Sequence, residues 1–122
     1  MAIYLTEEDV KNLLTMEIAL DSTEAMFVEK GEGYATNKPR YRVPFPGGSL
    51  QVMSASLPRL GVTGIKTYTS VKMGTRFHLY LYSSESGELL SIIEANTLGQ
   101  IRTGAATGIA TKYLSRKDSV SV

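Results

Sequence analysis

The sequence predicts an α+β fold, in which a mostly antiparallel sheet has flanking helices and a long helix ends the chain. Three observations support this class. Two capped helical segments occupy the first 33 residues, four or five β-rich segments follow, and residues 94–114 have the pattern of one helix of about 18 residues. Because the β-rich segments follow one another without intervening helices, most of them are expected to pair antiparallel.

Two helices are expected at the start. Thr6 precedes an acidic first turn, which suits the positive end of a helix dipole, and this helix is predicted to end near Leu14. Thr15 caps a second helix over about residues 16–30, which glycines at 31 and 33 end. Its apolar stripe is predicted to consist of Ile18, Ala19, Met26 and Phe27.

The strands are predicted from β-branched and aromatic runs bounded by turn residues. Prolines at both ends limit residues 36–46 to a short edge strand, and Gly47-Gly48 is a turn. A hairpin turn at residues 84–88 joins the two clearest strands. The further strands are predicted at residues 49–56, 61–70, 77–82 and 89–93. Arg59 and Arg76 are expected in surface loops.

The closing helix is rich in small residues. Asn96 or Thr97 is expected to cap it. Glycines at 104 and 108 weaken a helix interior, which indicates that another element approaches this helix closely. Its predicted face consists of Leu98, Ile101, Ala105, Ile109 and Lys112. From physics alone, Arg102 is either a surface residue of a well-packed helix or a group that reaches an anion near the helix start.

Composition excludes several classes of function. The chain has 122 residues, a formal charge of +1 and no cysteine, so disulfides and thiol chemistry are absent. No segment has the pattern of a signal peptide or a membrane span, so a cytoplasmic protein is the expectation. Scattered carboxylates and the single His78 predict no metal site. Tyrosines do not alternate with a basic patch, so no nucleic-acid partner is expected.

The stretch EANTLGQIRTGAATGIATKYLSRKD resembles the segment that joins the two domains of the ornithine cyclodeaminase/mu-crystallin family. The matching residues are Thr97, Arg102, Thr103, Gly104, Ala105, Ala106, Ile109, Ala110, Lys112, Tyr113, Leu114 and Arg116. The resemblance implies that residues 1–116 are a substrate-binding and dimerisation domain. It also implies that residues 117–122 begin the first strand of a Rossmann domain. Since no G-x-G-x-x-G occurs, the chain is expected to be a fragment or a truncated gene product that lacks that domain.

The resemblance implies a clamp of three cations around a substrate carboxylate. Arg40 lies thirteen residues before Met53, as a carboxylate-binding arginine does in the family, and Arg42 is the second choice. Lys66 matches a lysine close to the substrate and the nicotinamide, which makes it the candidate catalytic residue as well as a substrate-binding one. Arg102 completes the clamp. Without the resemblance, Arg40 can also be interpreted as a solvated charge on an edge strand. Lys66 can likewise be interpreted as a solvent-facing residue of its strand.

Other positions have weaker assignments. Gln51 is expected on the wall of the site, where ornithine cyclodeaminases carry an acidic residue for the distal amine, so ornithine itself is disfavoured as substrate. Thr103 is expected to reach a cofactor phosphate or ribose. Glu94 is expected to pair with one of the cations. Lys72 and Met73 lie in a loop that borders the site in the family, and they receive no role.

The whole protein is therefore expected to be an NAD(P)-dependent enzyme that acts on a small amino acid or cyclic imino acid. Its reaction would be amino-acid dehydrogenation, imine reduction or cyclodeamination, with NAD or NADP bound outside this chain. A homodimer is expected, because strands such as residues 77–82 expose more apolar surface than one small domain covers. The alternatives are a small-ligand binding protein like mu-crystallin or a non-catalytic dimerisation module.

Overall fold

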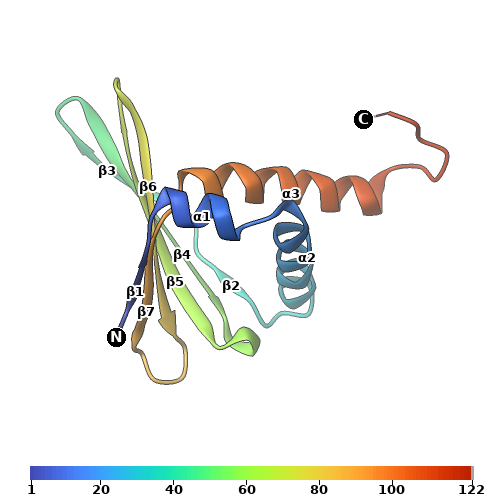
Figure 1. Ribbon diagram of the computed structural model, residues 1–122, viewed down its shortest axis with the longest axis horizontal. Coiled ribbons are helices and arrows are strands. Elements are labelled where there is room, and N and C mark those ends of the chain that lie inside the picture. Colours follow the sequence, from blue (N-terminus) through green and yellow to red (C-terminus); the bar gives the residue numbers. More distant parts are fainter. Residues whose placement is uncertain (122) are drawn as a thin grey trace.

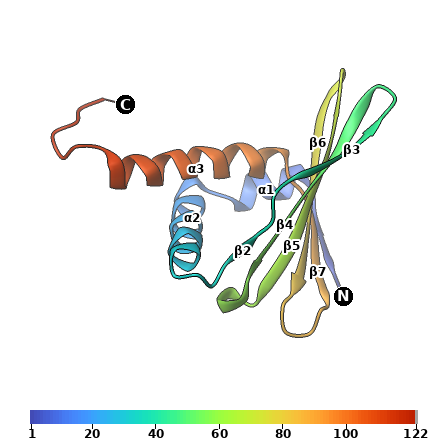
Figure 2. The same ribbon diagram turned by 180° about the vertical axis from the view of Figure 1, so that it is seen from behind.

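The computed structural model describes residues 1–121 and has the predicted α+β architecture. All three α-helices lie on one side of a single twisted sheet, and the last helix projects away from it (Figures 1 and 2). The elements are, in order, β1 Ile3–Leu5, α1 Glu7–Leu13, α2 Met16–Gly31, β2 Thr36–Asn37, β3 Tyr41–Phe45, β4 Gly48–Leu57, the 3-10 turn η1 Pro58–Leu60, β5 Val62–Val71, β6 Gly74–Ser83, β7 Leu89–Glu94 and α3 Asn96–Leu114.

The sheet of the described residues has seven strands in the order β1-β7-β6-β5-β4-β2, with β3 also pairing with β4. Only β1 and β7 pair in parallel, and every other pairing is antiparallel. The prediction of a mostly antiparallel sheet is therefore confirmed. The strand count is higher than predicted because β1 and β2 have only three and two residues, too short for a β pattern to be recognised.

The edge strand expected at residues 36–46 consists of two pieces, β2 and β3, which both pair with β4. Pro39 lies between them and has no backbone N–H to donate, which fits the interruption. The turn predicted at Gly47-Gly48 lies one residue earlier, at Pro46 and Gly47, and Gly48 already belongs to β4. Gly47 has a φ of 90°, which favours glycine. Arg76 was expected in a loop but lies on β6, while Arg59 lies in η1, where it pairs with Glu32.

Residues 117–121 form no strand in this chain. That residues 117–122 begin a nucleotide-binding domain stays a prediction. Ser119 N donates to the Arg116 carbonyl in a turn, and no strand of the sheet lies beside this segment (Figure 1). A strand needs a neighbour for its backbone hydrogen bonds, so the local apolar–polar alternation is insufficient by itself. Val122 lies outside the described residues.

Helices α2 and α3 pack closely, as the glycines of α3 indicated. An added Cβ at Gly108 would lie 3.0 Å from the Leu20 side chain, and one at Gly104 would lie 3.4 Å from that of Met16. The predicted stripes are only partly right. Ile18 and Phe27 are 49% and 44% exposed, and Lys112 is exposed and pairs with Glu24 at 2.8 Å. Contact through small residues buries only a narrow strip of each helix, chiefly Ala19, Ala105 and Ile109.

The start of α3 is capped by a residue distant in sequence. Neither Asn96 nor Thr97 caps the helix with its side chain, in contrast to the prediction. The Glu7 carboxylate instead accepts the backbone N–H groups of Asn96 and Thr97, at 2.6 and 3.0 Å. Asn96 Oδ1 accepts the N–H of Phe77 at 3.0 Å. The first turn of α1 therefore fixes where α3 leaves the sheet.

We expect Glu7→Gln to lower the free energy of unfolding by about 1–2 kcal/mol at pH 7, since glutamine directs an N–H₂ group toward donors. Burial by itself raises the pKa of Glu7, but hydrogen bonds from Thr97 and Asn96 outweigh it and hold this pKa below its usual value. A carboxyl with a depressed pKa stabilises the fold above its unfolded pKa, and this stability is lost as pH falls through the folded pKa.

Urea denaturation from pH 7 down to about pH 3 measures this effect, and the difference between variant and parent is expected to shrink toward acid. Glu8→Gln is the matched control, because Glu8 is exposed in the same helical turn. Equal stability losses in the two variants would contradict the capping role.

Candidate functional site

A cleft opens where the start of α3 passes over the helix side of the sheet. Its volume is about 540 Å³, and both layers line it. The sheet contributes Lys66, Thr75 and Phe77, and α3 contributes Asn96, Gly99, Gln100, Arg102 and Thr103. Two of the three predicted cations, Lys66 and Arg102, thus meet in one cleft, although 36 positions separate them in the sequence (102 − 66).

Lys66 is a half-buried cation in the middle of the sheet. Its Nζ lies 5.9 and 5.7 Å from the ring centroids of Tyr68 and Phe77, within the range of cation–π attraction. Burial lowers the pKa of Lys66, and the positive charges of Arg102 and Arg40 lower this pKa further. Lys66 therefore has cations as its charged neighbours, so a bound anion would stabilise its charged form.

Arg40 lies on the same side of the sheet but is not part of the cleft lining. Its Nη1 donates to the Tyr68 hydroxyl at 2.7 Å. The Tyr68 ring packs on that of Phe77, with centroids 4.6 Å apart, and Phe77 lines the cleft. Tyr68 thus connects Arg40 to the cleft. That all three cations bind one carboxylate stays a prediction.

Gln51 is 5% exposed and also lies on this side of the sheet, where it pairs in register with Tyr68. Its Oε1 accepts from Arg42 Nε at 2.9 Å, and its Nε2 donates to Ser49 Oγ at 2.8 Å. Gln51 was expected on the wall of the site, but it is not among the residues that line the cleft. Its contact with substrate stays a prediction.

Glu94 and Thr103 make contacts that differ from those expected. Among the described residues, Glu94 has no cationic partner, and its oxygens accept from the Tyr4 hydroxyl and from Glu7 N at 2.9 and 2.8 Å. Thr103 lines the cleft but donates its hydroxyl proton to the Gly99 carbonyl at 2.7 Å, which leaves only acceptor lone pairs. In this rotamer the Thr103 hydroxyl can accept a hydrogen bond but has no proton left to donate, and its contact with a cofactor stays a prediction.

Strand alternation separates the site from the other polar residues of β6. His78 and Arg76 pair in register with Thr67 and Thr69, so their side chains lie on the side opposite Lys66. Lys72 and Met73 form the tip of the β5–β6 turn. Sequence reasoning missed Tyr68, although the alternation that places Lys66 on one face of its strand also places Tyr68 there.

The charge distribution favours an anionic ligand. Residues 33–84 contain seven basic side chains and no acidic one. Every carboxylate of the chain therefore belongs to residues outside β2–β6. Among the described residues, no group of carboxylates and histidines is arranged to hold a metal ion. The cleft thus offers cationic and hydrogen-bonding groups, which suit a carboxylate.

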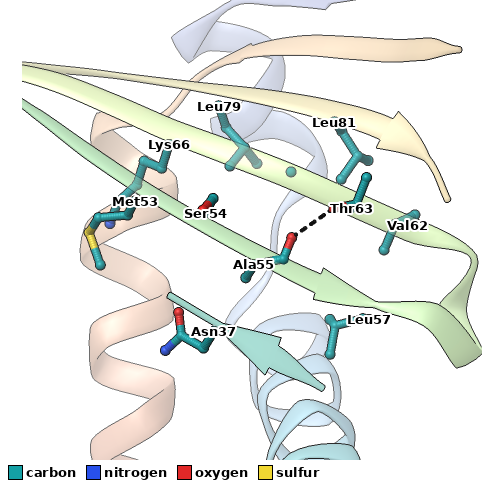
Figure 3. Close-up of a pocket in the computed structure, with 11 residues that line it drawn as sticks. Asn37, Met53, Ser54, Ala55, Leu57, Val62, Thr63, Lys66, Leu79 and Leu81 are labelled. Atoms are coloured by element: carbon teal, nitrogen blue, oxygen red, sulfur yellow. Dashed lines mark hydrogen bonds between the residues drawn. The ribbon is translucent and has the colours of Figure 1, made fainter. Parts of the chain in front are cut away.

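A second, apolar cavity of about 250 Å³ adjoins the site, with Lys66 at its border (Figure 3). It is lined by Asn37, Met53, Ser54, Ala55, Leu57, Val62, Thr63, Gly64, Lys66, Leu79 and Leu81. An added Cβ at Gly64 would lie 3.0 Å from the Tyr80 carbonyl, so a larger side chain would crowd the close approach of β5 and β6.

The model of the ornithine cyclodeaminase/mu-crystallin family matches residues 2–122, and the chain belongs to that family. The family resemblance stated from the sequence is confirmed. Among the described residues, no helix is long and apolar enough to cross a membrane.

Three relatives illustrate the similarity. An alanine dehydrogenase of Archaeoglobus fulgidus is 35% identical, over 96% of this chain and 38% of its own length. The structure of an archaeal alanine dehydrogenase dimer with bound NAD has a TM-score of 0.89 at 34% identity, over 97% of this chain and 38% of its own. Thermococcus litoralis Δ1-pyrroline-2-carboxylate reductase, in complex with NADH and L-proline, has a TM-score of 0.86 at 27% identity, over 96% and 39%. The chain thus spans less than two-fifths of the length of these relatives.

Proposed function

We propose that this chain is the substrate-binding domain of an NAD(P)-dependent enzyme that acts on a small amino acid or cyclic imino acid. The observation that carries the proposal is the meeting of Lys66 and Arg102 in one cleft, with Arg40 close enough to affect the Lys66 pKa. Amino and imino acids share a carboxylate, which arginine binds through two parallel hydrogen bonds. The names of the relatives support the same substrate class.

In this proposal, the residues of this chain bind and orient the substrate. Arg102 and Lys66 hold its carboxylate, and Arg40 adds positive charge from beside Tyr68. Fixing the carboxylate fixes the adjacent carbon, which is the reacting centre. When bound, the nicotinamide supplies a hydride to that carbon or accepts one from it. A cytoplasmic location is part of the proposal, because nicotinamide cofactors and free amino acids are cytoplasmic metabolites.

Turnover by the full-length protein tests this function. The protein is assayed for amino-acid oxidation and cyclic-imine reduction with NAD(H) and NADP(H), by nicotinamide absorbance, and for ammonia release from diamino acids. Turnover of at least one amino or imino acid is expected. Absence of turnover across the set, together with no binding of any amino acid or simple carboxylate, would exclude the proposal.

We expect the 122-residue chain alone to bind neither NAD nor NADP at micromolar concentration. A dinucleotide pyrophosphate is held by a glycine-rich turn between a strand and a helix, and the sequence has no such motif. Titration calorimetry with NAD and NADP measures this directly. A micromolar dissociation constant for either would show that the cofactor site belongs to this chain.

A homodimer is part of the same proposal. The face of the sheet away from the helices, termed here the open side, is covered by no other element of the described chain (Figures 1 and 2). Tyr4, Ile92, Tyr80 and Ile65 lie side by side on it across β1, β7, β6 and β5. One similar solved structure is a dimer, which supports pairing of this kind.

The solvent-exposed area of the chain also supports a homodimer. A globular monomer of 13.3 kDa exposes about 6,500 Å² by the usual scaling of surface with mass. This chain exposes 8700 Å². The excess of about 2,200 Å² exceeds the roughly 800 Å² that each partner loses in a standard interface. The surface is therefore large enough for contact with both a second copy and a further domain.

A further inference from the structure

Arg42 is held in place beside the cationic site. Its Nε donates to the buried Gln51, and Gln51 is itself anchored by its bond to Ser49. Among the described residues, no hydrogen bond or ion pair joins the two terminal nitrogens of Arg42 to another side chain. A guanidinium held by Nε with both terminal nitrogens free is preorganised to bind a carboxylate through two bonds.

The sheet register places Arg42 beside the site. Phe77, Tyr68, Gln51 and Arg42 form one row across β6, β5, β4 and β3, on the helix side. Lys66 and Met53 lie in the next row, two residues along. Strand spacing puts the Cα atoms of Lys66 and Arg42 about 12 Å apart. Both side chains are long and extend from the same face of the sheet, so their charged ends can reach two ends of one small molecule.

Among the described residues, Arg42 has no carboxylate partner. Because no acidic residue occurs between positions 33 and 84, no carboxylate of these strands neutralises Arg42. A distal amine on a substrate would meet Arg42 and the amide of Gln51, and like charges repel there. A distal carboxylate would instead meet the two free nitrogens of Arg42.

We propose that Arg42, positioned by Gln51, binds a second carboxylate of the substrate, so that the substrate is a dicarboxylic amino or imino acid. This inference rests on the proposed function, in which Lys66 and Arg102 bind the carboxylate beside the reacting carbon. Arg42 then acts as a specificity residue that selects substrates with an acidic side chain over those with a neutral or basic one.

Calorimetric titration of the full-length protein with succinate and butyrate tests the inference without requiring turnover. The two ligands have the same number of carbons and differ by one carboxylate. Succinate is expected to bind at least tenfold more tightly than butyrate. Equal affinities in the parent protein would overturn the inference.

The variant Arg42→Met keeps an apolar stem and removes the charge. It is expected to reduce the preference for succinate below threefold, and Arg42→Lys is expected to restore part of it. Arg76→Met is the matched control, because it removes the same charge from the opposite side of the sheet. A preference retained in Arg42→Met, or lost equally in Arg76→Met, would contradict the assignment.

The two proposals fail in distinguishable ways. If the protein turns over monocarboxylic amino acids and binds succinate no better than butyrate, the proposed function stands and the role of Arg42 is wrong. If it turns over no amino or imino acid and binds neither carboxylate, the proposed function and this inference both fail.

Discussion

Replacing Arg102 by lysine in the full-length protein is expected to lower kcat/KM for the proposed amino-acid or imino-acid substrate by about 10–100-fold. Arg102 lines the cleft opposite Lys66 and presents a planar fork to a carboxylate. Lysine keeps the charge but loses the second parallel hydrogen bond, and hydrogen bonds to charged groups contribute about 1.5–3 kcal/mol. Loss of orientation at the carboxylate also displaces the reacting carbon.

Steady-state kinetics of Arg102→Lys and Arg40→Lys, beside Arg76→Lys, measure this effect. Arg76 lies on β6 with its side chain on the opposite side of the sheet, so its replacement is expected to change kcat/KM less than twofold. Circular dichroism confirms that each variant is folded. An Arg102→Lys enzyme with unchanged kcat/KM would remove Arg102 from the substrate site and refute the clamp.

Replacing Ile65 by glutamate is expected to convert the proposed homodimer into a monomer. Ile65 lies on the open side of the sheet beside Tyr80, in the apolar row that extends to Tyr4 on β1. A carboxylate buried there without a partner costs several kcal/mol, whereas in the monomer it stays in water. Each 1.4 kcal/mol weakens association tenfold, so a shift of at least a hundredfold in the dimer dissociation constant is expected.

Sedimentation velocity at micromolar concentration distinguishes the two states. Ser84→Glu is the control, because it adds the same charge in the exposed β6–β7 loop outside the sheet. If the parent protein sediments as a monomer, the dimer proposal is wrong. If Ile65→Glu remains a dimer, the interface lies on another surface.

Local sequence signals predicted most of the fold because they act within a few residues. Thr6 and Thr15 accept backbone N–H groups three residues on, as the caps required, and Thr6 forms a reciprocal bond with Asp9. The β5 and β6 strands and the turns at Gly47 and Gly87 follow from β-branched runs and from glycines with positive φ. The glycines of α3 indicated a close neighbour, although they did not identify α2 as that neighbour.

The site was predicted less completely. The resemblance identified Lys66 and Arg102, which the structure brings into one cleft, but their shared role with Arg40 stays a prediction. The position of Gln51 and the involvement of Tyr68 depend on which strands are neighbours. A one-residue change of register would reverse the side on which each of them lies, and local sequence does not fix register between distant strands.

The sequence by itself determined the family, the fold class and the caps and turns, because these depend on residue types at fixed short spacings. Tertiary structure decided how α3 starts, since Glu7 reaches Asn96 and Thr97 from the other end of the chain. It also decided that Glu94 accepts from Tyr4 and Glu7 rather than from a cation. Arg42 acquired its fixed position from the register of the β3–β4 hairpin, which places it opposite Gln51. For Glu7 and Glu94 the physical reason is their separation in the sequence, because hydrogen bonds between distant residues form only once the fold has brought them together.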